Sequence, residues 1–140
     1  MALSGSCLCG KSTFTAELGP GGAGACHCGM CRKWSGGILM SVDCGNSVKF
    51  AVGSTLGSYK GSEWGERIFC ITCGSSLLWQ TQDGNNQHVS IQCFDDPAQF
   101  EIKSEIFIDK KPSNYALAGE RATMTEAEVY AMFAPEGETT

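Results

Sequence analysis

Seven of the nine cysteines in this chain of 140 residues lie in three short groups, and this clustering strongly constrains what the sequence can fold into. The groups read CLC, CHCGMC and CITC, at positions 7–9, 26–31 and 70–73. In a reducing compartment, clustered thiols are more often metal ligands or catalytic groups than disulfides. We therefore expect these groups to bind metal or to carry chemistry, with a disulfide framework as the weaker alternative.

Two of the groups have the form of a closed structural zinc site, which is tetrahedral and commonly built from two short cysteine turns. A glycine follows each turn, at Gly10 and Gly74, where a chain folding around a metal often needs a positive φ. The turns lie about 60 residues apart, and loop-closure entropy grows only slowly with such a separation. The alternative is that these thiols are unligated core residues. We predict a structural zinc with the ligands Cys7, Cys9, Cys70 and Cys73.

The remaining group has three thiols, and three protein ligands with one open position are typical of a catalytic zinc. Cys26, Cys28 and Cys31 would supply these ligands, and a fourth cysteine would close the position that water or substrate needs. His27 lies between two of them, but neighbouring side chains project apart, so we expect it to pack or to contact solvent rather than bind metal. His88 has no partner nearby in sequence, and no role is predicted for it.

A basic pair, Arg32 and Lys33, directly follows the three-cysteine group. Three thiolates on Zn²⁺ leave a net negative charge, and a thiolate substrate would increase it, so nearby cations would offset the build-up. The pair is also a candidate for binding the carboxylates of an anionic substrate. A solvated surface pair explains it equally well.

Secondary-structure patterns are mostly those of strands. Alternation places three apolar residues on one face of each of two segments: Phe14, Ala16 and Leu18, and then Val48, Phe50 and Val52. Residues 88–94 and 100–110 continue the strand pattern, and the polar loop around Asp83 and Gly84 predicts a hairpin within 76–93. The isolated Cys44 and Cys93 lie beside apolar residues and are predicted to pack as small hydrophobic side chains.

A helix signal is found only near the C-terminus. Thr125 and Glu128 form a capping box, and Val129, Met132 and Phe133 follow at helical spacing as predicted core contacts. The polar segment 134–140 contains Pro and Gly and is predicted to be frayed.

Length and charge limit the function classes. A chain of 140 residues with 42% hydrophobic content suffices for one domain, 1–140, in which 120–140 is a helical extension with a frayed tail. The first residues lack the pattern of a signal peptide, and no apolar run reaches membrane-spanning length, so we expect a soluble, cytoplasmic protein without a membrane partner. The formal net charge of −5 argues against nucleic acid as a partner.

Five motifs follow one another along the chain in this order: GSCLCG, CHCGMCRKWSGG, FCITCGSSL, FDDP and IFIDKKP. Through these motifs the sequence resembles the GFA family, the glutathione-dependent formaldehyde-activating enzymes, which includes centromere protein V. The match spans roughly residues 5–115, and the ordered set of three cysteine motifs is far more specific than any one of them.

The resemblance implies a mainly β, zinc-bound β-tent fold, in which small antiparallel sheets are clipped by the four-cysteine site and a short C-terminal helix follows. It also implies two Zn²⁺ ions per chain, with Cys7, Cys9, Cys70 and Cys73 matching the structural ligands. Cys26, Cys28 and Cys31 match the ligands of the catalytic zinc. The implied activity is that of a carbon-sulfur lyase, which condenses glutathione with formaldehyde to S-(hydroxymethyl)glutathione or runs the reverse reaction.

Three functional hypotheses follow from different classes of protein. The first is a zinc enzyme acting on a small-molecule thiol, such as glutathione, and an aldehyde. The second is a zinc-stabilised binding or scaffold module, in which the three-cysteine site gains a fourth ligand and is inert. The third is a thiol redox protein in which CGMC or CITC cycles as a dithiol.

Overall fold

The computed structural model describes residues 1–133 and consists mainly of β-strands in two sheets, which confirms the mainly β prediction. The small sheet is antiparallel, with the order β1 (Leu3–Ser6), β2 (Thr13–Ala16) and β5 (Lys49–Phe50). The large sheet has the order β11 (Ala122–Met124), β10 (Ile102–Ile106), β3 (Ala23–Cys26), β4 (Leu39–Asp43), β9 (Gln87–Ser90), β8 (Ser76–Thr81), β7 (Gly65–Cys70) and β6 (Leu56–Tyr59).

Most strands of the large sheet pair with antiparallel neighbours, but β10 runs parallel to both β3 and β11. The predicted hairpin is present, since β8 pairs antiparallel with β9 across the Asp83–Gly84 loop. Three 3₁₀ turns, Ile91–Cys93, Pro97–Gln99 and Ile108–Lys110, follow β9 and flank β10, so both predicted strands are shorter than their sequence patterns.

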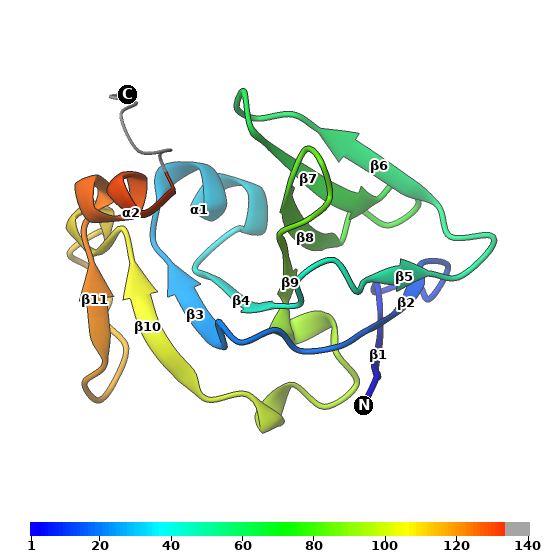
Figure 1. Ribbon diagram of the computed structural model, residues 1–140, viewed down its shortest axis with the longest axis horizontal. Coiled ribbons are helices and arrows are strands. Elements are labelled where there is room, and N and C mark those ends of the chain that lie inside the picture. The colour runs from blue at the N-terminus through cyan, green and yellow to red at the C-terminus, as the bar shows by residue number, and fades with distance from the viewer. Residues whose placement is uncertain (134–140) are drawn as a thin grey trace.

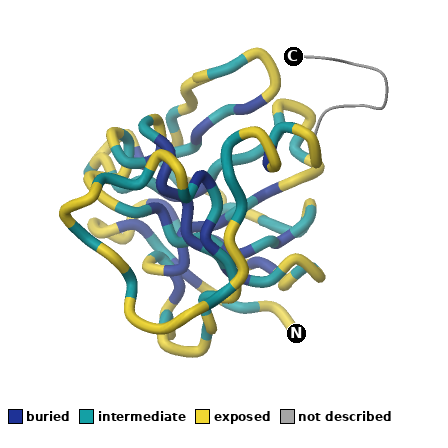
Figure 2. Tube along the Cα trace, turned by 90° about the vertical axis from the view of Figure 1, so that its left-hand side faces the viewer, coloured by how far each residue is buried: buried dark blue, intermediate teal, exposed yellow. Residues whose placement is uncertain are grey.

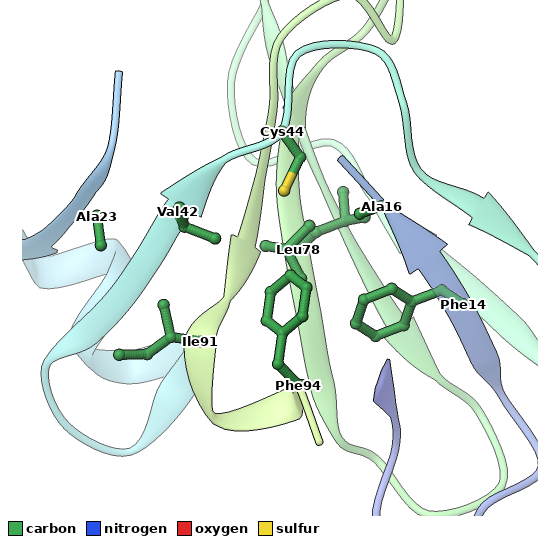
Figure 3. Packing of buried hydrophobic residues seen from close by; sticks show 9 residues of the cluster. Phe14, Ala16, Ala23, Val42, Cys44, Leu78, Ile91 and Phe94 are labelled. Carbon is green, nitrogen blue, oxygen red and sulfur yellow. The ribbon is translucent and has the colours of Figure 1, made fainter. Parts of the chain in front are cut away.

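The main hydrophobic core lies between the two sheets (Figure 3). Phe14 from β2 packs edge-on against Phe94, with ring centroids 5.3 Å apart, while Leu78 and Val42 approach from the large sheet. Cys44 is buried among them, as expected for a small apolar side chain. Buried positions follow the strands through the middle of the molecule, and exposed positions mark the connecting loops (Figure 2).

Two apolar residues at predicted buried positions lie at the surface instead. Val52 is fully exposed because β5 ends at Phe50 and a turn follows, closed by the Ser54 N–H donating to the Ala51 carbonyl. Leu18 is half-exposed because the chain leaves β2 after Ala16. In both cases a turn ends the strand before the alternating pattern does.

A short helix that the sequence patterns did not predict, α1 (Gly29–Ser35), follows β3. The Cys28 side chain caps its first turn by accepting a hydrogen bond from the Cys31 N–H, and Gly36 ends it in the left-handed region at φ 75°. Seven residues are too few to show helical periodicity, so the two caps define this element rather than an apolar stripe.

The C-terminal helix α2 (Glu126–Phe133) confirms the predicted capping box: the Glu128 N–H donates to Thr125 Oγ1, and the Thr125 N–H donates to the Glu128 carboxylate. Val129 is buried as predicted, but Met132 is largely exposed, so the predicted core contact of Met132 is wrong. The Phe133 side chain and residues 134–140, including the predicted frayed tail, lie outside the described part of the structure.

The two helices lie side by side over the ends of β3, β10 and β11 (Figure 1). Within residues 1–133, neither helix has the length and apolar character that crossing a membrane requires. Val129 of α2 therefore packs in the same buried cluster as Cys26, Cys28 and Cys31, where β3 passes into α1.

We expect Thr125→Ala to lower the free energy of unfolding by about 1 kcal/mol, because the first turn of α2 loses its cap. Chemical denaturation of the metal-loaded protein measures this difference. Thr123→Ala, at an exposed position on β11, serves as the matched control. Equal losses in the two variants would show that the capping box does not stabilise the fold.

Candidate metal centres

A cluster of four thiols joins the two sheets. Cys7 and Cys9 lie in the turn that follows β1 of the small sheet, while Cys70 ends β7 of the large sheet and Cys73 lies in the turn to β8. Their sulfur atoms all lie within 4.8 Å of one another. Gly10 and Gly74 have φ values of 80° and 81°, as the predicted turns around a metal require.

The spacing of these sulfur atoms fits zinc and excludes a disulfide in this structure. Cys7 Sγ lies 3.6 Å from Cys9 Sγ, which lies 3.9 Å from Cys70 Sγ. A tetrahedral zinc with bonds of about 2.3 Å separates its sulfur ligands by about 3.8 Å, whereas a disulfide bond measures about 2.0 Å. The donor set and its geometry therefore suit a closed four-thiolate site.

Hydrogen-bond donors around this cluster favour the thiolate form that a metal needs. The Ser12 and Thr55 side chains lower the pKa of the Cys70 thiol to about 5, and the Ser75 hydroxyl, 3.2 Å from Cys73 Sγ, lowers the pKa of that thiol to about 7. The backbone N–H of Ser12 donates to Cys7 Sγ at 3.3 Å. Such outer contacts orient ligands and stabilise their charged form.

A second cluster lies where β3 passes into α1. Cys26 ends β3, Cys28 caps α1 and Cys31 lies in its first turn, and the three sulfur atoms lie within 4.8 Å of one another. The sequence thus folds locally into a strand, a cap and a helical turn that point three thiols at one place. Among the described residues, this group contains three candidate ligands, compared with four in the first cluster.

The three thiols cannot all ionise readily without a cation. Hydrogen bonds with Cys28 and Cys31 raise the pKa of the Cys26 thiol, while hydrogen bonds from Cys26 and Cys31 lower the pKa of the Cys28 thiol. The three thiols therefore titrate as one interacting group, in which ionisation of one thiol opposes ionisation of the others. A divalent metal would allow all three to act as thiolates, so this donor set also fits zinc.

A guanidinium in contact with this cluster belongs to Arg67 on β7, which the sequence patterns did not single out. Its two terminal nitrogen atoms each lie 3.6 Å from Cys31 Sγ, and its guanidinium carbon lies 5.1 Å from the centre of the Trp34 ring. Arg67 is buried, which is rare for an arginine, but this burial appears only in the folded chain, so no pattern in the sequence identified it. The Arg67 guanidinium thus lies where it can offset negative charge at Cys31, and charge compensation by Arg32 and Lys33 stays a prediction.

The predicted basic pair is placed differently. The Arg32 side chain donates from Nε to the His27 carbonyl at 2.9 Å, and Lys33 is exposed on α1. Arg32 therefore braces the turn that carries Cys26 and Cys28, and its role in binding a substrate stays a prediction, as does that of Lys33.

His27 is fully buried and belongs to a network rather than to the cluster. Its Nε2 donates to the Glu105 carboxylate at 2.7 Å, its Nδ1 lies 2.9 Å from the Tyr115 hydroxyl, and Arg121 donates to the other Glu105 oxygen at 2.8 Å. Burial opposes ionisation of Glu105, but the hydrogen bonds from Arg121 and His27 prevail and lower the pKa of its carboxyl. This network fixes the backbone between the candidate ligands Cys26 and Cys28. Of the two roles expected for His27, packing or solvent contact, the structure shows packing.

A cavity of about 180 Å³ adjoins the three-thiol cluster, with Cys26, Cys28 and Cys31 in its wall. Arg67 and His88 also line it, so the structure gives His88 a place beside the cluster that its sequence position did not indicate. Neither Arg32 nor Lys33 is among the described residues lining this cavity.

Together, the mainly β fold and its two thiol clusters define a small protein with one four-thiol and one three-thiol candidate metal centre. Residues 2–110 match the family model of the glutathione-dependent formaldehyde-activating enzyme, GFA. The chain therefore belongs to the GFA family. His27 and Glu105 lie inside the matched range, whereas Tyr115 and Arg121 lie beyond it.

Two similar proteins extend this comparison. An uncharacterised lyase of Schizosaccharomyces pombe is 29% identical over 126 residues, which cover 89% of this chain and 92% of that protein. A crystal structure of a Rhodobacter sphaeroides protein is similar in fold, with a TM-score of 0.59 and 22% identity over 71% of this chain and 97% of that one.

We expect the two clusters to differ in their effect on stability. Cys70→Ser should lower the melting temperature strongly, because a closed site that joins two sheets contributes its binding free energy to folding. Cys28→Ser should chiefly remove one metal and leave the melting temperature close to that of the parent. Elemental analysis with thermal unfolding tests this, and equal losses of melting temperature would contradict the assignment.

We also expect Arg67→Met to weaken metal binding at the three-cysteine cluster by about 10- to 100-fold, since a contact that stabilises the ligand Cys31 is lost. Competition with a chromophoric chelator measures the affinity. Lys33→Met removes an equal charge from an exposed position and is the matched control. An unchanged affinity in Arg67→Met would show that its guanidinium does not support the metal.

Proposed function

We propose that this protein is a zinc-dependent carbon-sulfur lyase of the glutathione-dependent formaldehyde-activating type. It would join a small-molecule thiol, with glutathione as the first candidate, to an aldehyde such as formaldehyde, or run the reverse reaction. Its cofactors would be two Zn²⁺ ions per chain, one at each cluster, and its location would be cytoplasmic. Family membership and the similar lyase support this class of reaction.

One observation carries the proposal: the second cluster offers three thiols, all of which line one cavity, whereas the first cluster offers four, enough to complete a tetrahedral site. A zinc ion held by three cysteines would supply an open Lewis-acid position that stabilises a substrate thiolate at neutral pH. Cys26, Cys28 and Cys31 are the residues that would hold it.

The surrounding residues position this centre and limit its charge. Arg67 places a guanidinium beside Cys31 and offsets negative charge that a bound thiolate would increase. The His27 network and the Arg32 side chain hold the turn that carries Cys26 and Cys28. The cavity walls limit access of water to the reacting atoms and hold the two reactants near each other.

The bond changes balance without an oxidant or reductant. The thiol gives up its proton, its sulfur forms a bond to the aldehyde carbon, and the electron pair of the carbonyl moves to oxygen, which takes up a proton. The reverse reaction breaks the same carbon-sulfur bond.

The binding-module hypothesis remains the second candidate and makes a different prediction. In that case a fourth ligand completes the cluster, and added thiol does not reach the metal. The redox hypothesis requires thiols that cycle, and metal binding at both CGMC and CITC would remove it.

We expect glutathione to alter the absorption of the cobalt-substituted protein, because a fourth sulfur ligand changes tetrahedral cobalt-thiolate bands. The change should saturate with glutathione and weaken as pH falls, since the incoming thiol must lose its proton. Consumption of formaldehyde in the presence of glutathione by the zinc-loaded protein tests the reaction itself.

Two variants serve as controls for this test. Cys28→Ser should lose both the spectral response and the reaction, while Cys93→Ser, which removes a thiol outside both clusters, should keep them. A cobalt spectrum that does not change at saturating glutathione would reject the open-site mechanism in favour of the binding module.

A further inference from the structure

The cavity beside the three-cysteine cluster is lined mainly by apolar and aromatic side chains from segments far apart in the chain. Its walls include Leu39 from β4, Trp79 from β8, Ile106 at the end of β10, Val129 from α2, and also Trp64 and Phe107. Because the candidate ligands form part of the same wall, a molecule bound through sulfur at the cluster projects directly into this apolar space.

Aromatic contacts shape two sides of the cavity. Trp64 and Trp79 meet edge-to-face with ring centroids 5.7 Å apart, and Phe107 meets Tyr130 in the same manner, also at 5.7 Å. Among the described residues, Phe107 is the one non-glycine residue with a positive φ, at 55°. Phe107 thus adopts a backbone conformation that is costly for phenylalanine, and its ring forms part of the cavity wall.

Polar groups in the wall are few and are mostly engaged. The Arg67 guanidinium contacts Cys31 Sγ, and Ser62 Oγ accepts the Gly65 N–H. Burial lowers the pKa of the His88 imidazole, which favours its neutral form. The described lining residues include no Asp, Glu or Lys, so the ammonium of glutathione would find no counter-charge there, and its carboxylates would find only Arg67, which already contacts Cys31 Sγ.

Size leads to the same conclusion. The volume is about 180 Å³. An apolar protein cavity of roughly 150 Å³ takes up benzene, so this space suits one ring or a branched aliphatic group. An amide group placed there without a hydrogen-bond partner would bind unfavourably, and an unpaired carboxylate more so. The peptide arms of glutathione would therefore have to lie outside this cavity.

We infer that the reactant held at the three-cysteine cluster carries a compact apolar group, the size of one ring, within two bonds of its reacting sulfur or carbon, and that this group occupies the cavity. The inference rests on the proposed function for the presence of a thiol or thiol adduct at the cluster. The apolar group belongs either to the thiol or to the aldehyde, and the experiment below separates these sources.

The binding test uses the zinc-loaded full chain with phenylmethanethiol and ethanethiol, followed by fluorescence, since two of the three tryptophans line the cavity. Phenylmethanethiol should bind on the order of 10- to 100-fold more tightly, as expected for burying one aromatic ring. Val129→Phe fills the cavity and should remove this preference. Val52→Phe makes the same change at a fully exposed position and should keep it.

A second variant covers the case in which Val129→Phe fails to fold. Ile106→Ala enlarges the cavity and should shift the preference toward naphthalen-2-ylmethanethiol, whose larger ring system the parent protein should bind less well. A preference unchanged by Ile106→Ala, in a folded variant, would overturn the assignment of the cavity as the binding site.

Comparing the reaction rates of different pairs of thiol and aldehyde identifies which reactant carries the apolar group. Faster reaction of phenylmethanethiol with formaldehyde than of glutathione with formaldehyde assigns it to the thiol, and faster reaction of glutathione with phenylacetaldehyde assigns it to the aldehyde. Either result supports the inference. Preference for glutathione with formaldehyde, together with equal binding of the two simple thiols, overturns it and leaves the proposed function intact.

Failure of the proposed function gives a different result. If no thiol binds the zinc-loaded protein, phenylmethanol, which has the same ring without the sulfur, tests the cavity alone. Binding that Val129→Phe abolishes and Val52→Phe keeps would support an apolar-ligand site without thiol chemistry. No binding of phenylmethanol or of any thiol would overturn both proposals.

Discussion

The link between the two sheets is the constraint on which the rest of the structure depends. The small sheet has three short strands, and β5 contributes only two residues. Its attachment to the large sheet comes from the core around Phe14 and from the four thiols at the ends of β1 and β7. Because strands this short bury little apolar surface, a metal held by both sheets would supply stability that the hydrophobic core of a small domain often lacks.

The second cluster shows how a local sequence motif depends on distant segments. Three thiols within six residues define the ligand set, but the turn that presents them is held by contacts made far along the chain. His27 reaches Glu105 on β10, which is held in turn by Arg121, while Tyr115 contacts the other side of the ring. The parallel pairing of β10 with β3 makes these contacts possible, since it sets Glu105 beside Ala25 and so next to the turn.

The amino-acid sequence alone predicted the ligand groups because their information is local: spacing within a turn and a glycine with positive φ, as at Gly10 and Gly74, are readable from a few residues. The capping box at Thr125 was readable for the same reason. The role of Arg67 was not readable from a few residues, because its guanidinium contacts Cys31 only when the chain folds and brings β7 next to α1. Val52 was placed in the core because alternation continued past Phe50, and the turn that ends the strand there is set by contacts with β2.

The two clusters use one kind of ligand atom, so their surroundings must create any difference in chemistry. At the four-thiol cluster, Ser12, Thr55 and Ser75 place neutral donors around the sulfur atoms, and the ligands come from two sheets that cannot separate without breaking the core. At the three-thiol cluster, the ligands come from one continuous segment, a charged donor, Arg67, contacts Cys31, and the remaining side opens onto an aromatic cavity. A fixed charge beside an apolar space favours an anionic sulfur carrying an apolar substituent over a wholly polar ligand, because the guanidinium offsets the charge of the sulfur while the walls desolvate the rest.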